Sequence, residues 1–393
     1  MKNWLKIFFF IIIFFGITPY IFSSLYLPSV YENNLYSEIV QRQQKNSSIY
    51  GTALNPGYFF YKHELIKNRK PEVVVLGSSR VLEFREESFL VPFVNAGGVM
   101  HHLSDGLTFL NKMFRYHKPK YIILGLDFWW FNDNYPQSKY IQYPVNTGTQ
   151  MSLNKILKPI YFLFSNKVNF SSLKYIFNND YINNKITNYD SLGISAISSS
   201  DGWRRDGSYF YAKKTFGFSE ILKEKAFEDT ITRIKKGTRY FQYGSEISEE
   251  RKKVFDQIIK TIKKNNVEPI ILLTPLPNIV IQEMDDIRYQ YVFKLREMIK
   301  KIKVISFDYH DVSKLVPDDC EFLDGYHGGN VLFDRILLDI NESLIAENFN
   351  SILNVEQIKK NINKFKGHIL VKYNPKMYKF NEIDFLNLGC NKK

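Results

Sequence analysis

Short apolar runs that alternate with amphipathic segments are the feature that most constrains how this chain can fold. Uninterrupted apolar runs of this length, bounded by turn residues, are typical of strands buried on both faces of a parallel sheet. Three amphipathic helices are predicted. The first begins at Ser104 and ends before Pro119, the second covers 246–265 and the third covers 285–301. Strands are predicted at residues 73–76, 121–131, 268–278 and 302–309. This alternation predicts an α/β fold with a parallel sheet flanked by helices.

The remaining segments have weaker patterns and define the predicted domain boundaries. The α/β domain is predicted over residues 71–347, preceded by a membrane-proximal connector at 28–70. Residues 134–245 are rich in aromatic, Asn and Ser residues without a clear period, and we interpret them as an insertion or cap. A basic extension over 348–393 is expected to be solvated, with folding back or a position near lipid as the alternatives.

The N-terminus carries a membrane signal. Residues 7–27 contain no charge, which matches the roughly 20 residues needed to cross a bilayer. Lys2 and Lys6 precede this run and favour a cytoplasmic N-terminus. A cleaved signal peptide is the alternative, but no good small-x-small cleavage site follows the run. We therefore predict a single-pass anchor over residues 1–27, with the C-terminal domain facing the periplasm or the cell exterior.

Composition excludes several classes of protein. The chain has 45% hydrophobic residues and is not disordered. Its net charge of +13 suits anionic lipid headgroups or an acidic glycan, or reflects a lysine-rich composition. No nucleic-acid-binding signature is found, and no nucleic acid partner is predicted. Cys320 and Cys390 are the only cysteines, so a single disulfide is possible and a disulfide scaffold is excluded.

Polar residues follow the predicted strands where ligand sites of parallel sheets lie, beyond the carboxyl ends. Ser78 and Ser79 follow the first strand, and Asp127 lies within the 121–131 run after Gly125 and Leu126. Asp324 and His327 lie in a loop before the last predicted helix. A carboxylate three residues before a histidine can hold one ring nitrogen and leave the other to act as a base for a serine.

The order of these motifs resembles the SGNH (GDSL-like) hydrolase superfamily, in particular its membrane-anchored branch, which includes the D-alanyl-lipoteichoic acid biosynthesis protein and the alginate O-acetylases. The matching stretches are "VVVLGSSRV", "FVNAGG", "YIILGLDFWWF" and "FLDGYHGGNVLFDRIL". The resemblance implies an SGNH-like three-layer fold, with Ser79 as nucleophile, His327 as base and Asp324 as the residue that orients it.

Two sequence segments, those expected to supply an oxyanion glycine and an asparagine, differ from the superfamily pattern. The expected oxyanion glycine falls on Met100, with Gly97 and Gly98 close by, and the expected asparagine falls on Asp127. An ionised aspartate cannot donate a hydrogen bond to an oxyanion, and its charge opposes that of the intermediate. We therefore expect the donors to be the Ser79 N–H and one N–H from the Gly97-Gly98 turn.

Three further groups of residues could bind a ligand, and each also has a simpler structural interpretation. Trp203, Arg204 and Arg205 could hold a sugar face and an acidic group, or form a surface turn with two arginines. His101 and His102 lack a carboxylate at a metal-ligand spacing, and neither a metal nor a cofactor is predicted. Trp129 and Trp130 are expected in the core or in a cleft wall.

These observations predict an acyltransferase or esterase that modifies a cell-envelope polysaccharide, with acetyl as the favoured acyl group. The resemblance implies a membrane-bound O-acyltransferase as the partner that supplies the acyl group, since export separates the domain from cytosolic acyl donors. The predicted partners are thus the lipid bilayer, an envelope glycan and this transferase. The alternative is a non-catalytic SGNH-like scaffold for polysaccharide assembly or export.

Overall fold

A parallel five-stranded sheet forms the centre of the protein, as seen in a computed structural model. The model describes residues 2–55, 58–136, 149, 151–165, 167–168, 170–177, 191–217, 226–316, 318–344, 349–372 and 381–392. The strand order is β3-β2-β4-β8-β9, and every neighbouring pair is parallel. The strands are β2 (Val73–Leu76), β3 (Phe93–Ala96), β4 (Tyr121–Leu126), β8 (Glu268–Leu273) and β9 (Ile305–Asp308). The predicted α/β class with a parallel sheet is confirmed.

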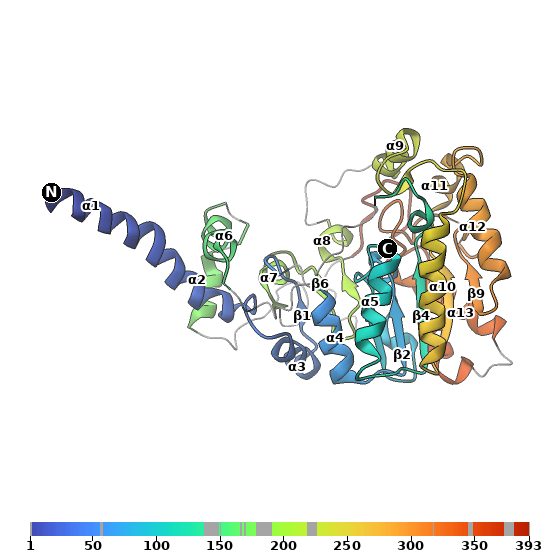
Figure 1. Ribbon diagram of the computed structural model, residues 1–393, viewed down its shortest axis with the longest axis horizontal. Helices are drawn as coiled ribbons and strands as arrows, with labels where there is room; N and C mark the ends of the chain where they lie inside the picture. The colour runs from blue at the N-terminus through green and yellow to red at the C-terminus, as the bar shows by residue number, and fades with distance from the viewer. Residues whose placement is uncertain are drawn as a thin grey trace.

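Helices cover the sheet and account for its apolar sequence. All four residues of β2 are buried, so both faces of this strand are covered. In Figure 1, α5 and α10 lie across the face of the sheet that is turned toward the viewer. The larger helices of this part of the chain are α5 (Leu103–Met113), α10 (Glu249–Lys264), α12 (Gln290–Lys301), α13 (Asn330–Ser343) and α14 (Val355–Lys364).

The strand order creates a switch point beside β2. The chain leaves β2 for β3 on one side and returns to β4 on the other. Leu76 is in register with both Ala96 and Leu124, so β2 and β3 end at one level and β4 ends two residues beyond it. Ligand sites of parallel sheets form at such switch points. The residues that follow Leu76 therefore lie at the favoured position for a site.

Several predicted boundaries were wrong. The run at 121–131 leaves the sheet after Leu126 and forms a 3-10 helix, η4 (Phe128–Phe131). The run at 268–278 ends as a strand at Leu273, because Pro275 and Pro277 cannot donate ladder hydrogen bonds, and α11 (Asn278–Glu283) follows. Strand β3 was not predicted, although all four of its residues are buried.

The predicted connector over 28–70 is a folded part of the main body. It contains α3 (Tyr36–Asn46), β1 (Ile49–Tyr50) and α4 (Tyr58–Arg69), and Tyr61, Leu65 and Ile66 of α4 are fully buried. Strand β1 pairs with β5 (Ser191–Leu192) and β6 (Gly202–Trp203), and β6 pairs with β7 (Tyr209–Phe210). The connector and the described part of the predicted insertion thus share one small sheet.

Elsewhere in the insertion the described residues form helices. Part of the 134–245 segment lies outside the described residues. The helices in its described part are α6 (Leu153–Phe164), η5 (Phe170–Ile176), α7 (Ile194–Ser199), α8 (Ala212–Thr215), α9 (Glu228–Lys236) and η6 (Arg239–Phe241). Two further 3-10 helices, η2 (Ser79–Val81) and η3 (Glu86–Ser88), follow β2, and η8 (Phe349–Ser351) precedes α14.

The chain begins with a helix that projects from the rest of the molecule (Figure 1). Helices α1 (Lys2–Ile12) and α2 (Thr18–Ser29) are joined by a π-helical segment, η1 (Ile13–Ile17). Residues Asn3–Ser29 form the one helix among the described residues that is long and apolar enough to cross a membrane. This helix coincides with the predicted span at 7–27.

The C-terminal extension is packed against the protein in its described part, contrary to the expectation of a solvated tail. Helix α14 packs on α13, and Ile358 is fully buried. A disulfide joins Cys320 to Cys390, and Lys392 Nζ donates to the carbonyl of Cys320 at 2.8 Å. Residues 373–380 of the basic extension lie outside the described residues.

The glycine of β4 lets η2 pack closely over the sheet, which gives a first prediction. A Cβ on Gly125 would fall on Cγ1 of Val81, within η2. We expect Gly125→Ala to lower the free energy of unfolding by about 1–3 kcal/mol through overpacking. Urea unfolding in detergent measures this loss.

The double variant Gly125→Ala/Val81→Ala is the matched control, because it removes the methyl groups on which the new Cβ would fall. We expect Val81→Ala to cost less in the Gly125→Ala background than in the wild type. Equal costs in the two backgrounds would show that η2 does not lie against Gly125.

Candidate active site

The turn after β2 presents Ser79 to solvent. The strand ends at Leu76, and the Ser78 Oγ accepts a hydrogen bond from the Arg80 N–H at 3.1 Å, as an N-cap does. This cap starts η2 immediately beyond the edge of the sheet. Ser79 is exposed, whereas Arg80 and Val81 point into the protein and are buried. The local sequence therefore directs one hydroxyl outward and anchors the following residues.

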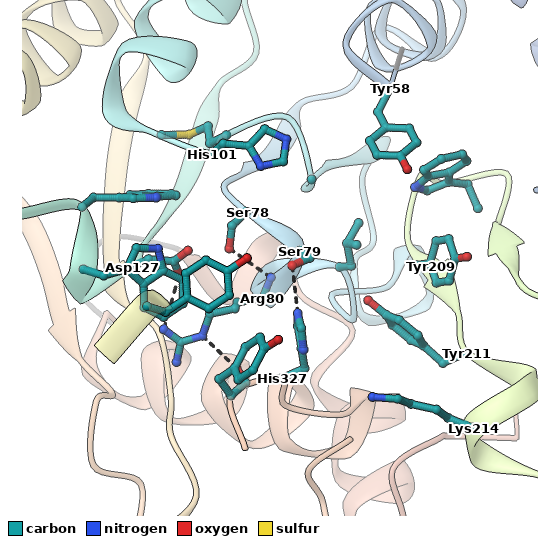
Figure 2. A pocket seen from close by; sticks show the side chains of 18 of the residues that line it. Tyr58, Ser78, Ser79, Arg80, His101, Asp127, Tyr209, Tyr211, Lys214 and His327 are labelled. Carbon is teal, nitrogen blue, oxygen red and sulfur yellow. Dashed lines mark hydrogen bonds and ion pairs between the residues drawn. The ribbon is translucent and has the colours of Figure 1, made fainter. Parts of the chain in front are cut away.

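Ser79, His327 and Asp324 form a continuous chain of hydrogen bonds. Figure 2 shows the first bond of this chain, from Ser79 to His327. The Ser79 Oγ lies 2.8 Å from His327 Nε2, and both carboxylate oxygens of Asp324 lie 2.9 Å from His327 Nδ1. An ionised carboxylate only accepts hydrogen bonds, so Nδ1–H donates to Asp324 and Nε2 is left to accept from the serine. The predicted convergence of these three residues is found, with the roles of the two ring nitrogens assigned.

The loop that carries the histidine is organised by Asp324 itself. Its Oδ1 also accepts the backbone N–H groups of Tyr326 at 3.2 Å and of His327 at 2.9 Å. Such a turn holds a side chain and backbone in register over three residues. The Asp-x-x-His spacing thus positions the Asp324 carboxylate against the His327 ring within one short turn.

A lysine from a distant segment completes the carboxylate's environment. Lys214 Nζ lies 2.9 Å from Asp324 Oδ2. Burial opposes ionisation of Asp324, but the charges of His327 and Lys214 outweigh burial and hold the pKa of the Asp324 carboxyl well below its usual range. Asp324 is therefore ionised at neutral pH, as a residue that orients an imidazole must be.

A cavity of about 580 Å³ opens above Ser79 and His327. Its wall is mainly aromatic and includes residues from the sheet edge, the insertion and the connector. Tyr58, Trp129, Trp130, Tyr135, Trp203, Tyr209, Tyr211, Tyr240 and Tyr326 all line it. Trp129 and Trp130 thus belong to both the core and the cleft wall, which were the two expected locations.

Beneath the serine lies a buried ion pair that sequence reasoning did not identify. Arg80 and Asp127 are almost completely buried, and Arg80 Nη1 lies 3.4 Å from Asp127 Oδ1. The Thr274 Oγ1 is 3.1 Å from the same oxygen. Burial raises the pKa of Asp127, and Arg80 acts against this rise. Asp127 thus serves as the counter-ion of Arg80, and the guanidinium offsets the charge that we expected to oppose an oxyanion.

Arg80 also connects the serine turn to the histidine loop. Its Nε donates to the carbonyl of Tyr326 at 2.8 Å, and its Nη2 donates to the carbonyl of Pro275. The guanidinium carbon lies 5.1 Å from the centre of the Trp129 ring. The residue next to Ser79 therefore contacts the residue next to His327, which fixes the two partners relative to each other.

The expected donors at the Gly97-Gly98 turn are not directed at the serine. The Gly97 N–H donates to the Asn95 Oδ1 at 2.8 Å, and the Gly98 N–H donates to the carbonyl of Gly77 at 3.1 Å. The Met100 N–H bonds to the same carbonyl at 3.2 Å. These bonds tie the turn to β2, so the geometry does not support a donor from this turn.

The Trp-Arg-Arg segment is divided between two roles. Trp203 lines the cavity, with its ring centre 4.4 Å from that of Tyr58. Arg204 is buried with its Nη1 3.8 Å from Glu83, and Arg205 Nε lies 2.6 Å from Glu86. Neither arginine lines the cavity. The structure thus brings the expected sugar-stacking residue to the site but not the two expected anion-binding residues.

His101 lines the cavity from above Ser79 (Figure 2), and His102 caps α5. Among the residues that the structure describes, no group of three or more His, Cys, Asp or Glu side chains is arranged to hold a metal. Cys320 is bonded to Cys390 and offers no thiol.

Two functional features escaped the sequence analysis. Arg80 follows the serines directly, so its position was visible in the sequence, but nothing near it along the chain indicates that it is buried or that Asp127 is its partner. Lys214 has no signal in the sequence, because it comes from α8 and lies 110 residues before Asp324. Only the folded chain shows that contact.

Comparison of the chain with protein-family models, with curated proteins and with solved structures found no match in any of the three. The interpretation of this site therefore depends on its residues and their geometry.

Removal of Lys214 tests the charge balance at Asp324. We expect Lys214→Met to be less stable than the wild type by about 1–3 kcal/mol near neutral pH, because Asp324 loses a charged partner. The folded pKa of Asp324 lies below its ordinary value of 3.8, so its contribution is complete above about pH 4 and is lost as the pH falls further. The stability gap should therefore narrow as the pH falls from 3.8 through the pKa of Asp324 in the variant, which His327 alone still lowers. Urea midpoints in detergent across this range measure it.

Lys213→Met is the matched control. Both lysines act on the neighbouring Asp201, whereas only Lys214 bonds to Asp324. The Lys213 variant should differ from the wild type by a constant amount below about pH 4. Parallel wild-type and Lys214→Met curves in that range would contradict the assignment.

The buried pair beneath the serine gives a second prediction here. We expect Arg80→Met to lose about 3–5 kcal/mol of unfolding free energy, because it leaves a buried carboxylate without its counter-ion. The double variant Arg80→Met/Asp127→Asn should lose less than the sum of the two single variants. Additive losses would show that the two charges are not coupled.

Proposed function

We propose that the protein is an SGNH-like serine acyltransferase or esterase that acts on a cell-envelope polysaccharide. The observation that carries this proposal is the hydrogen-bond chain from Ser79 through His327 to Asp324, with distances of 2.8 and 2.9 Å, in an open cavity. A serine, a histidine and an ionised carboxylate in this order are the parts required for nucleophilic acyl transfer. Their chain order and their place beyond the first strand fit the superfamily that the sequence resembles.

The residues suggest a two-step reaction. The Ser79 Oγ attacks the carbonyl carbon of an acyl ester while its proton moves to His327 Nε2. The bond to the leaving oxygen then breaks, His327 returns the proton to that oxygen, and an acyl-serine remains. A sugar hydroxyl or water next gives its proton to His327 and attacks the acyl carbon. The bond from that carbon to the Ser79 Oγ then breaks, and His327 returns the proton to Oγ, which regenerates Ser79. Asp324 stays ionised and stabilises the imidazolium at each step.

Charge on the tetrahedral intermediate requires hydrogen-bond donors. With the Gly97 and Gly98 N–H groups bonded elsewhere, we assign the Ser79 N–H as the donor from the chain. Loss of one donor costs on the order of a hundredfold or more in rate. This assignment predicts an enzyme of modest rate in transfer and in hydrolysis alike, because both reactions pass through a tetrahedral intermediate at the same place.

The aromatic wall favours a carbohydrate substrate. Trp203, Tyr58 and Tyr209 form one side of the cavity, and Trp129, Tyr240 and Tyr326 form another. Flat rings bind the C–H faces of sugar rings, and their hydroxyl and N–H groups bond to sugar hydroxyls. An acetyl group is the acyl group that this proposal favours.

The proposed location is the outer face of the cytoplasmic membrane. The N-terminal helix supports a single-pass anchor, and Lys2 and Lys6 favour a cytoplasmic N-terminus. The disulfide between Cys320 and Cys390 fits an oxidising compartment. A membrane-bound O-acyltransferase would then supply the acyl group across the bilayer.

A non-catalytic scaffold remains the second candidate, because the bonds made by the Gly97 and Gly98 N–H groups weaken the case for an oxyanion hole. In that case the same cavity would bind a glycan without chemistry.

Covalent labelling separates the two functions. We expect a fluorophosphonate probe to label the detergent-solubilised protein at Ser79, because His327 can accept the hydroxyl proton. Labelling should be lost in Ser79→Ala and His327→Ala, and should fall by up to about 10⁴-fold in Asp324→Asn. Gel fluorescence and peptide mass spectrometry measure the adduct and its position.

Ser78→Ala is the matched control, since Ser78 is the neighbouring hydroxyl but caps η2 instead of contacting His327. It should retain labelling at a cost of about 1 kcal/mol in stability. Absence of labelling in the folded wild type, with a known serine hydrolase labelled in parallel, would favour the scaffold.

A further inference from the structure

The segment from Met151 to Phe177 exposes an unusual number of large apolar side chains. It contains α6 and η5, which the catalytic proposal does not use, and none of the residues described in this segment lines the cavity. We call its exposed apolar side chains the apolar ridge. The ridge consists of Leu153 (71% exposed), Leu157 (45%), Tyr161 (57%), Phe164 (77%), Phe170 (52%) and Phe177 (88%).

The ridge residues of α6 lie on one face of the helix. Leu153, Leu157, Tyr161 and Phe164 follow the spacing that aligns side chains along a helix. The opposite face is occupied, because Lys155, Pro159 and Leu163 are buried. Helix α6 therefore packs one face on the protein and leaves a second, apolar face exposed.

Hydrogen bonds attach this segment to the anchor helix. The Ser23 Oγ donates to the carbonyl of Ile156 at 2.8 Å, and the Tyr26 hydroxyl lies 3.0 Å from the Ser172 Oγ. Lys155 Nζ bonds to the Asn33 Oδ1 at 3.0 Å. Figure 1 shows α6 beside α2, between the projecting part of the anchor and the rest of the protein. The orientation of the ridge is therefore set by specific contacts.

These contacts locate the segment relative to a bilayer. A hydrocarbon core requires about 20 helical residues, so a span that begins at Asn3 ends near Phe22. The bonds to α6 and η5 begin at Ser23, directly after that point. From Trp4 to Ile17 the helix has only exposed residues, as expected for a segment in lipid. The segment 151–177 thus lies where the headgroup region would be.

The charge of the segment fits the same position. Residues 151–177 contain four lysines and no acidic residue. Lys158, Lys167 and Lys174 are exposed, and Lys167 Nζ lies 5.1 Å from the centre of the Tyr161 ring. Aromatic rings and lysines together favour the membrane interface, where rings enter the acyl boundary and ammonium groups reach headgroup phosphates.

We propose that residues 151–177 form a second membrane contact, in which the apolar ridge lies in the lipid interface next to the anchor. Two attachment points, a spanning helix and an interfacial helix, restrict rotation of the protein about the anchor. The partner is the lipid surface itself, because the exposed apolar side chains belong to a segment that is bonded to the anchor helix just beyond its lipid-length stretch, and because the same segment carries exposed lysines.

Depth-dependent quenching tests the proposal in the full-length protein. Cys320 and Cys390 are disulfide-bonded, so a new cysteine can be labelled selectively. Leu157→Cys and Phe164→Cys are labelled with an environment-sensitive fluorophore and reconstituted into vesicles of phosphatidylcholine and phosphatidylglycerol. We expect a blue-shifted emission and loss of most of the intensity when the lipids carry bromine near the headgroup.

Phe293→Cys is the matched control, because Phe293 is a similarly exposed phenylalanine (61%) on α12 of the main body. Its label should emit as in water and resist brominated lipid. The proposal is overturned if the label at Phe164 behaves like that at Phe293. It is also overturned if the Phe164 label is shielded only at high protein-to-lipid ratio and is insensitive to bromine, which would identify a second copy of the chain as the partner.

Discussion

The buried guanidinium of Arg80 holds the candidate site together. It contacts Asp127 after β4, the carbonyl of Pro275 after β8 and the carbonyl of Tyr326 in the histidine loop. A buried cation is costly unless all its donors are paired, so these three segments must reach their positions together. Since Arg80 follows Ser79 directly, the same contacts determine where the serine hydroxyl lies. Ser79 and His327 are 248 residues apart and still meet at 2.8 Å.

Around this ion pair, the walls of the cavity come from parts of the chain that look independent in sequence. Strand β1 of the connector pairs with β5 and β6 of the insertion, and this small sheet carries Trp203 and Tyr209 to the cavity. Helix α8 then follows β7 and brings Lys214 to Asp324. The disulfide from Cys320 to Cys390 ties the C-terminal segment to the start of the loop that bears Asp324. Lys214 thus both lines the cavity and contacts a member of the hydrogen-bond chain.

The proposed function and the proposed second membrane contact concern one physical problem, which is how a domain held at a membrane would meet its substrate. A spanning helix alone leaves a domain free to rotate about it. An interfacial helix with an exposed apolar face would remove much of that freedom and present the cavity to the bilayer in a restricted set of orientations. An acyl donor delivered through the membrane would benefit from such a restriction, because orientation lowers the entropic cost of transfer.

The sequence by itself determined the elements that depend on short-range patterns. The apolar run at 73–76 is β2 without any change of bounds, α10 lies within its predicted range, and the apolar N-terminus is one helix. The pairing of Asp324 with His327 also follows from local spacing, because a three-residue turn contains both groups. In each case the information lies within a few residues along the chain, where side-chain period and turn chemistry operate.

Tertiary structure alone decided the features that depend on contacts between distant segments. It placed β3 and α4 in the main body, turned the Gly97 and Gly98 N–H groups toward Asn95 and Gly77, and used Arg204 and Arg205 in ion pairs with Glu83 and Glu86. It also joined Arg80 to Asp127 and Lys214 to Asp324. A charged or polar side chain takes whichever partner the folded chain brings within reach, and local sequence does not specify that partner. The physical reason is that hydrogen bonds and ion pairs depend on distances of a few ångströms, which only the packing of the whole chain sets.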